Sequence, residues 1–296
     1  MVVQQLTTAT PLEKHLWTWQ NYNIQYTVMG DGPSLLLVHG FGASLGHWRK
    51  NIPALAAGGY RVYAIDLLGF GGSDKPAIDY TLDVWQELLK DFCAAHINQP
   101  TVFVGNSIGG LLCLMLLANH PELARGGILL NCAGGMNHRP DELAPPLRLI
   151  MATFTNLVRS PRFGPLVFNQ VRKKERIRRS LSQVYRNREA VTDELVDMLY
   201  APSCDEGAQK VFASVLTAPP GPTPAELLPK VNVPLLVMWG EADPWTPISA
   251  AKLYRNHAET HPLKFVAIPD TGHCPHDDRP EVVNPLMLDW LSQLPV

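Results

Sequence analysis

Short apolar runs alternate with segments of helical spacing along most of this chain, and this alternation restricts the possible folds more than any other feature. Strands are predicted at residues 24–28, 34–38, 61–65, 101–105 and 126–131, and helices at 81–96 and 108–120. The pattern resumes later with strands at 234–239 and 263–268 and helices at 248–257 and 282–294. Such alternation is typical of a mostly parallel α/β sheet with helices on both faces.

A long helical segment interrupts this pattern. Residues 135–222 have helical spacing and no clear strand, and they end in the Pro-rich stretch 218–224, which suits a return connection. We therefore predict a helical cap at 135–222, inserted between two parts of one α/β core at 1–134 and 223–296.

Composition and charge narrow the class of protein. Apolar residues make up 46% of the chain and the formal net charge is −2, which fits a folded globular protein and does not suggest a nucleic-acid partner. The first residues lack the charged and apolar regions of a secretory signal. The five scattered cysteines indicate free thiols in a reducing compartment. We expect a cytoplasmic protein that is not secreted.

The segment Gly105-Asn106-Ser107-Ile108-Gly109 carries the sharpest chemical signal. It matches the pattern G-x-S-x-G and lies between a predicted strand and a predicted helix. A serine on such a tight turn holds its hydroxyl clear of the backbone, and the glycines leave room for the turn. Ser107 is the predicted nucleophile.

A serine nucleophile needs a base and an acid, which follow it in the order Asp then His in this kind of fold. His273 comes just after the last predicted strand and is the predicted base. Asp243 follows the strand at 234–239 and is the predicted acid, with Glu241 as the alternative. Cys274 and His276 lie beside His273, but no matching cluster appears elsewhere, so no metal site is expected.

Acyl transfer also needs donors for an oxyanion. We expect the backbone N–H groups of Ile108 and Phe41 to supply them, because Phe41 lies in the Gly-rich loop after the strand at 34–38. A second Gly-rich loop, Asp66–Ser73, lacks the Lys-Ser/Thr pair of a phosphate-binding loop and is interpreted as structural.

Together these motifs resemble the α/β-hydrolase superfamily. The matching segments are HGFG (39–42), DLLGFGGS (66–73), GNSIGG (105–110), GEADPW (240–245) and GHCPHDDRPEVVN (272–284). The resemblance implies an eight-stranded, mostly parallel sheet, a cap after the sixth strand, and no metal or organic cofactor. The last segment is similar to the pheophytinase and chlorophyll dephytylase branch, which implies Ser107, Asp243 and His273 as the triad and hydrolysis of the phytyl ester of chlorophyll or pheophytin.

The cap is expected to set the choice of substrate. Its apolar residues suit a long isoprenoid chain, but they would equally suit packing on the core: Leu147, Leu149, Ile150, Met151, Phe154, Leu157, Phe163, Leu166, Val167 and Phe168. The dense basic run Arg172–Arg179 suggests peripheral contact with a photosynthetic membrane, or simply a solvated face. The expected substrate contacts are Gly40, Phe41, Asn106, Met151, Phe154 and Trp245.

The sequence is also compatible with three other functions. The same triad could hydrolyse a C–C bond in a ring-cleavage acid, or act as a general lipophilic esterase. A non-catalytic ligand receptor could use the same scaffold. Opening of a haloalkane or epoxide needs a carboxylate nucleophile, whereas position 107 is serine.

Overall fold

The computed structural model describes residues 12–137 and 145–294, apart from the side chains of residues 145–149 and 151. The N-terminal stretch in which no secretory signal is expected therefore lies largely outside the described residues. The described part contains a single eight-stranded sheet whose spatial order is β1-β2-β4-β3-β5-β6-β7-β8. Its strands are β1 (His15–Trp19), β2 (Tyr22–Met29), β3 (Ser34–Val38), β4 (Arg61–Ile65), β5 (Thr101–Asn106), β6 (Ala124–Leu130), β7 (Leu235–Gly240) and β8 (Leu263–Ile268).

Most of the sheet is parallel. Only the pairs β1–β2 and β2–β4 are antiparallel, and every pair from β4 onward is parallel. The helical segment enters between β6 and β7. The predicted fold, an eight-stranded and mostly parallel sheet with an insertion after the sixth strand, is confirmed.

Helices cover both faces of the sheet, which explains why its central strands are apolar throughout. The first face carries α2 (Leu82–Phe92), α3 (Ile108–Asn119) and α10 (Lys252–His257), and the second carries α1 (Ile52–Ala57) and α12 (Pro280–Ser292). In β3, Leu36 and Val38 face the first layer, whereas Leu35 and Leu37 face the second. All four side chains are fully buried, as expected for a parallel strand between two helical layers.

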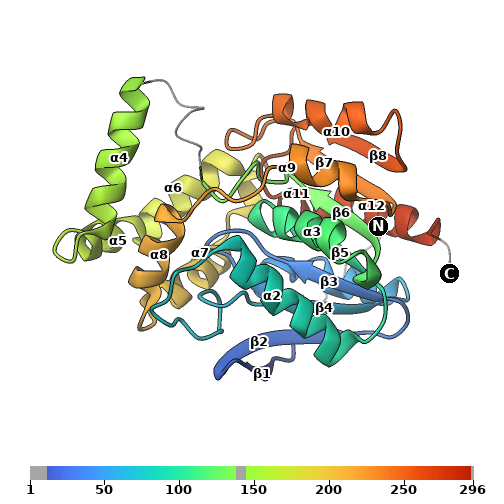
Figure 1. The fold of residues 1–296 in the computed structure, drawn as a ribbon, viewed down its shortest axis with the longest axis horizontal. Helices are drawn as coiled ribbons and strands as arrows, with labels where there is room; N and C mark the ends of the chain where they lie inside the picture. Colours follow the sequence, from blue (N-terminus) through green and yellow to red (C-terminus); the bar gives the residue numbers. More distant parts are fainter. Residues whose placement is uncertain (1–11, 138–144, 295–296) are drawn as a thin grey trace, which may run out of the picture.

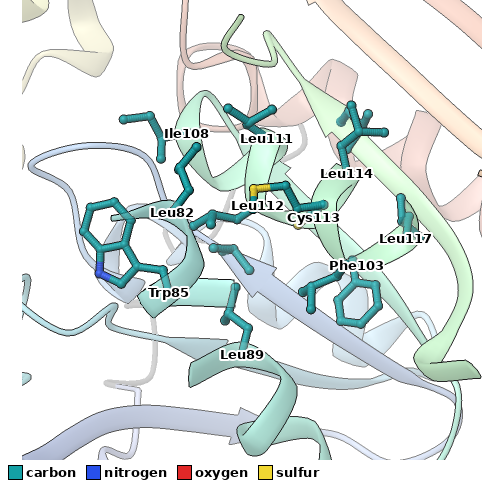
Figure 2. Packing of buried hydrophobic residues seen from close by; sticks show 14 of the residues in the cluster. Leu82, Trp85, Leu89, Phe103, Ile108, Leu111, Leu112, Cys113, Leu114 and Leu117 are labelled. Atoms are coloured by element: carbon teal, nitrogen blue, oxygen red, sulfur yellow. The ribbon is translucent and has the colours of Figure 1, made fainter. Parts of the chain in front are cut away.

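Helix α3 is the centre of the first layer. Every residue from Ile108 to Leu117 is buried, so the helix is apolar on all sides. Figure 2 shows Leu82, Trp85 and Leu89 of α2 beside α3, and Phe103 of β5 below Leu117 of α3. This packing fixes the start of α3, where Ser107 lies.

The inserted segment contains five α-helices among its described residues. They are α4 (Pro145–Arg159), α5 (Gly164–Val171), α6 (Lys174–Val184), α7 (Asp193–Tyr200) and α8 (Ala208–Thr217). Figure 1 shows them gathered beside the sheet, with α4 at the outer edge of the molecule. A short helix, α9 (Pro224–Leu227), then leads back to β7, and α11 (Pro275–Asp278) follows the His273 loop.

The sequence patterns missed two elements at the start of the chain. Strand β1 alternates half-buried and exposed residues and lies at the sheet edge, where one apolar face is enough. Helix α1 is only six residues long, too short for a clear helical period. The helix predicted at 81–96 ends as α2 at Phe92 and continues as one π-helical turn, Cys93–Ile97.

Candidate active site

Ser107 lies on a strained turn between β5 and α3. Its φ is 57° and its ψ is −121°, a conformation that costs a non-glycine residue about 1–3 kcal/mol. Two hydrogen bonds hold the turn: Ser107 N donates to Leu130 O at 3.0 Å, and Ala133 N donates to Ser107 O at 3.0 Å. Ser107 is partly exposed, while Asn106 and Ile108 on either side of it are buried. The turn thus presents the hydroxyl-bearing residue to the surface.

The two glycines of the G-x-S-x-G segment are required by close backbone contacts. A Cβ on Gly105 would lie 2.3 Å from Gly109 O, and a Cβ on Gly109 would lie 2.2 Å from Val38 O. Both distances are shorter than any real contact of that kind, and the obstructing atoms are backbone atoms, which cannot move aside cheaply. This turn therefore needs glycine at both positions, because any side chain there would collide with the backbone.

His273 and Asp243 form a buried hydrogen-bonded pair. The Nδ1 atom of His273 lies 2.6 Å from Oδ2 of Asp243, and both side chains are almost fully buried. Because Asp243 binds Nδ1, the imidazole nitrogen Nε2 is left to act as a base. Glu241, the alternative acid, is exposed.

Asp243 is held by three further donors. The Nδ2 atom of Asn131 donates to its Oδ2 at 2.7 Å, the backbone N–H of Trp245 donates to its Oδ1 at 2.7 Å, and the hydroxyl of Thr246 also donates to Oδ2. Burial alone would raise the pKa of the Asp243 carboxyl, but His273, Thr246 and the Trp245 N–H together hold that pKa below its ordinary value. The carboxylate is therefore ionised and fixed in orientation.

Asn106 ties the base to the serine turn. Its Nδ2 donates to His273 O at 2.9 Å and to Leu130 O at 3.1 Å. The residue directly before Ser107 thus contacts the backbone of His273, which brings the two loops together. Asn106 was predicted to contact substrate, but it is only 2% exposed and its amide is used by these two carbonyls. These two bonds support the site, and contact of Asn106 with substrate stays a prediction.

The Gly-rich loop after β3 lies against the serine turn. A Cβ on Gly40 would lie 3.3 Å from the Cβ of Ser107, so the loop passes directly beside this residue. His39 supports the loop: its Nδ1 bonds Gly40 O at 2.8 Å and its Nε2 accepts from Leu67 N at 3.1 Å. Ile108 is the first residue of α3, where helix geometry leaves the N–H without a partner inside the helix.

The second Gly-rich loop, Asp66–Ser73, has a structural part in supporting these loops. The buried Asp66 carboxylate accepts hydrogen bonds from Leu45 N at 2.6 Å and from Gly72 N at 2.7 Å. A Cβ on Gly71 would overlap the Asp66 carboxyl, and the φ of Gly71 is 51°. This agrees with the structural interpretation of the loop.

The other predicted substrate contacts are spread between core and cap. Trp245 is 56% exposed and its ring lies 5.2 Å from that of His273, while Phe41 is 40% exposed. Phe154 is exposed on α4, and no contact between it and the site is seen. The side chains of Met151, Leu147 and Leu149 lie outside the described part.

Several residues around the site were not anticipated from the sequence. Asn131 follows β6, and Thr246 comes three residues after Asp243; their proximity to strand ends was a usable signal for both. Tyr185 and Asp277 gave no such signal, because they meet only through the packing of the cap on the His273 loop. Across the described residues, no three His, Cys, Asp or Glu side chains gather in a way that could hold a metal ion.

Comparison with known proteins identifies the family. The model of the alpha/beta hydrolase family matches residues 35–286. The chain is 30% identical to the chloroplastic pheophytinase of Arabidopsis thaliana over 89% of its own length, and it spans only 62% of that protein. It is 29% identical to 2-hydroxy-6-oxo-6-(2'-aminophenyl)hexa-2,4-dienoic acid hydrolase of Metapseudomonas resinovorans, over 91% of this chain and 87% of that one.

Among solved structures, a serine hydrolase involved in carbazole degradation superposes with a TM-score of 0.73. It is 26% identical, and the match covers 95% of this chain and 99% of that one. The solved structure thus matches this chain over almost its whole length. The chain belongs to the alpha/beta hydrolase family.

Proposed function

We propose that this protein hydrolyses carboxylic esters through an acyl-enzyme formed on Ser107. The observation that carries the proposal is the buried 2.6 Å contact between His273 Nδ1 and Asp243 Oδ2, on a loop that Asn106 ties to the strained turn of Ser107. A fixed imidazole with a free Nε2 and a serine presented by a tight turn are the two parts that nucleophilic catalysis needs.

The proposed reaction has two halves. His273 Nε2 takes the proton of Ser107 as Oγ attacks the ester carbonyl, and the backbone N–H groups of Ile108 and Phe41 stabilise the oxyanion. His273 then gives the proton to the leaving alcohol, which departs as the acyl-enzyme forms. Water, deprotonated by the same histidine, attacks the acyl-enzyme and releases the acid.

For the substrate we propose a lipophilic ester, specifically the phytyl ester of chlorophyll or pheophytin. Similarity to pheophytinase supports this choice, as do the exposed aromatic rings of Phe41 and Trp245 beside the site. An epoxide substrate is disfavoured because the residue on the turn is serine and not a carboxylate. C–C hydrolysis is the second candidate, supported by the similarity to the dienoic acid hydrolase.

A substrate panel tests the proposal. Wild-type protein and Ser107→Ala are incubated with a soluble aryl ester, chlorophyll, pheophytin and a ring-cleavage acid, and products are identified. Ser180→Ala, on the exposed side of α6, is the matched control. We expect release of phytol in multiple turnovers, and a loss of at least about 10³-fold in Ser107→Ala only.

The outcomes separate the alternatives. Turnover of the ring-cleavage acid alone would replace ester hydrolysis by C–C hydrolysis. Turnover of the soluble aryl ester but not of chlorophyll or pheophytin would indicate a general lipophilic esterase. A single slow turnover, or equal activity in Ser107→Ala, would overturn catalysis by this serine and favour a receptor.

A further inference from the structure

Exposed apolar side chains are concentrated on one part of the cap. Among the described residues, nine large apolar side chains are exposed, and six of them lie on or between α4 and α5. Their exposed fractions are 62% for Ile150, 36% for Phe154, 38% for Leu157, 52% for Phe163, 61% for Leu166 and 43% for Val171. We call these six residues the α4–α5 face. Figure 1 shows both helices at the outer edge of the molecule.

The side chains on α4 form one stripe. Ile150, Phe154 and Leu157 are spaced by four and three residues, which places them on the same side of the helix. Val158, next to this stripe, is buried at 1% exposure. Only part of the apolar side of α4 thus packs against the rest of the cap. The other part, which carries Ile150, Phe154 and Leu157, faces outward.

The charged residues within the segment that carries this face have a single sign. Residues 145–174 contain six Arg or Lys and no Asp or Glu, although the whole chain has a net charge of −2. Arg159 donates to the carbonyl of Thr217, and Arg172 to the carbonyl of Ser203, so neither guanidinium is neutralised by these contacts. Lys173 is exposed beside Arg172.

The basic run on α6 is a weaker candidate for contact. Lys174 pairs with Asp197 at 2.6 Å, and Arg178 pairs with Asp193. Two of its cations therefore already have carboxylate partners. The structure moves the centre of the predicted membrane contact from the run Arg172–Arg179 toward the α4–α5 face.

We propose that the α4–α5 face binds the surface of an anionic lipid bilayer. Exposed aliphatic and aromatic side chains, in a segment whose charged residues at 145–174 are all cations, match the acyl boundary and the charged headgroups of such a surface. No helix in the described residues is long and apolar enough to cross a membrane, so the contact is made by helices that lie on the surface.

Three neighbouring aromatic rings lie between α5 and the loop beside Ser107. The ring of Phe168 on α5 lies 5.2 Å from that of Phe212 on α8, which lies 6.4 Å from that of Phe41 in the loop beside Ser107. A lipophilic ester leaving the bilayer would follow these rings to the serine. This route rests on the proposed function, whereas lipid binding by the face does not.

Vesicle sedimentation tests the proposal. The full chain is mixed with vesicles of phosphatidylcholine, alone or with phosphatidylglycerol. We expect binding that needs the anionic lipid and weakens with salt. Ile150→Ser with Leu166→Ser should weaken it by about tenfold or more, since two aliphatic side chains leave the membrane boundary. Leu16→Ser, an equally exposed change on β1, should bind like wild type.

A second pair of double variants tests the contribution of charge to lipid binding. Arg162→Gln with Lys173→Gln should weaken binding, whereas Lys230→Gln with Lys252→Gln on the core should not. No binding by wild type, or equal binding by the face and control variants, would overturn the proposal. A concentration-dependent dimer abolished by the face variants would assign the face to a second copy instead.

Activity on a soluble aryl ester keeps the two proposals apart. The face variants should retain wild-type turnover of that ester, since none of the changed residues lies at Ser107. Lipid binding without any esterase activity would refute the proposed function alone. Esterase activity without lipid binding would refute the docking surface alone.

Discussion

Tyr185 joins the cap to the loop that carries His273. Removing its hydroxyl group tests how much this junction contributes to stability. Tyr185 follows α6 and is 1% exposed. Its hydroxyl donates to Asp277 Oδ2 at 2.8 Å and lies 2.6 Å from His47 Nε2. Asp277 also pairs with Arg49 at 3.0 Å and with Lys50 at 2.9 Å. These cations and the charge of His47 hold the pKa of Asp277 at about 2, against the effect of its burial.

Removing this hydroxyl should be costly. Tyr185→Phe deletes a hydrogen bond to an ionised carboxylate, worth about 1.5–3 kcal/mol, and leaves His47 Nε2 buried without that partner. Because Arg49 and Lys50 still neutralise Asp277, we expect a total loss of about 3 kcal/mol. For a domain of this size that corresponds to a fall in Tm of roughly 5–8 °C.

Thermal and urea unfolding of Tyr185→Phe and wild type measure the effect. Tyr60→Phe, a half-buried tyrosine beside α1, is the control for loss of a phenol oxygen elsewhere. The backbone N–H of His273 donates to Val184 O at 2.8 Å, directly before Tyr185, so turnover should fall together with stability. A change in Tm no larger than that of the control would refute the reasoning that this hydroxyl links cap and core.

Three other predictions test separate parts of the structure. Burial lowers the pKa of His47 to about 4 from 6.5, so the unfolded chain takes up the proton first. The contribution of His47 to the free energy of unfolding should therefore be fully present above pH 6.5, and that free energy should fall by up to about 3 kcal/mol toward pH 4. Thermal melts of His47→Gln should lack this fall, and a pH dependence of Tm parallel to that of wild type would contradict the prediction. Asn131→Ala removes a 2.7 Å donor to Asp243 and should lower kcat/KM on a soluble ester about tenfold, whereas an unchanged value would exclude a positioning role. Gly109→Ala would place a Cβ 2.2 Å from the backbone of β3 and should cost about 3 kcal/mol or more, whereas Gly134→Ala, with open space at its Cβ, should melt like wild type.

The fold was largely predictable because parallel strands between two helical layers are apolar along their whole length. The predicted strands at 34–38, 61–65 and 263–268 have the same bounds as β3, β4 and β8. The edge strand β1 and the short helix α1 were not predicted, because a half-exposed edge and a six-residue helix give little periodic signal.

The sequence by itself determined the central sheet and selected Ser107 as the candidate nucleophile, since the strand, the tight turn and the following helix are local in the chain. It also selected Asp243 as the acid, with Glu241 as the alternative. Only the tertiary structure decided that Asp243 contacts His273, that Asn106 is buried, and that the α4–α5 face is exposed. These facts depend on side chains that meet across distant parts of the chain, and on which apolar surface the cap leaves uncovered. Local sequence patterns record neither, because the same apolar helix residue serves equally well against the core, a substrate or a membrane.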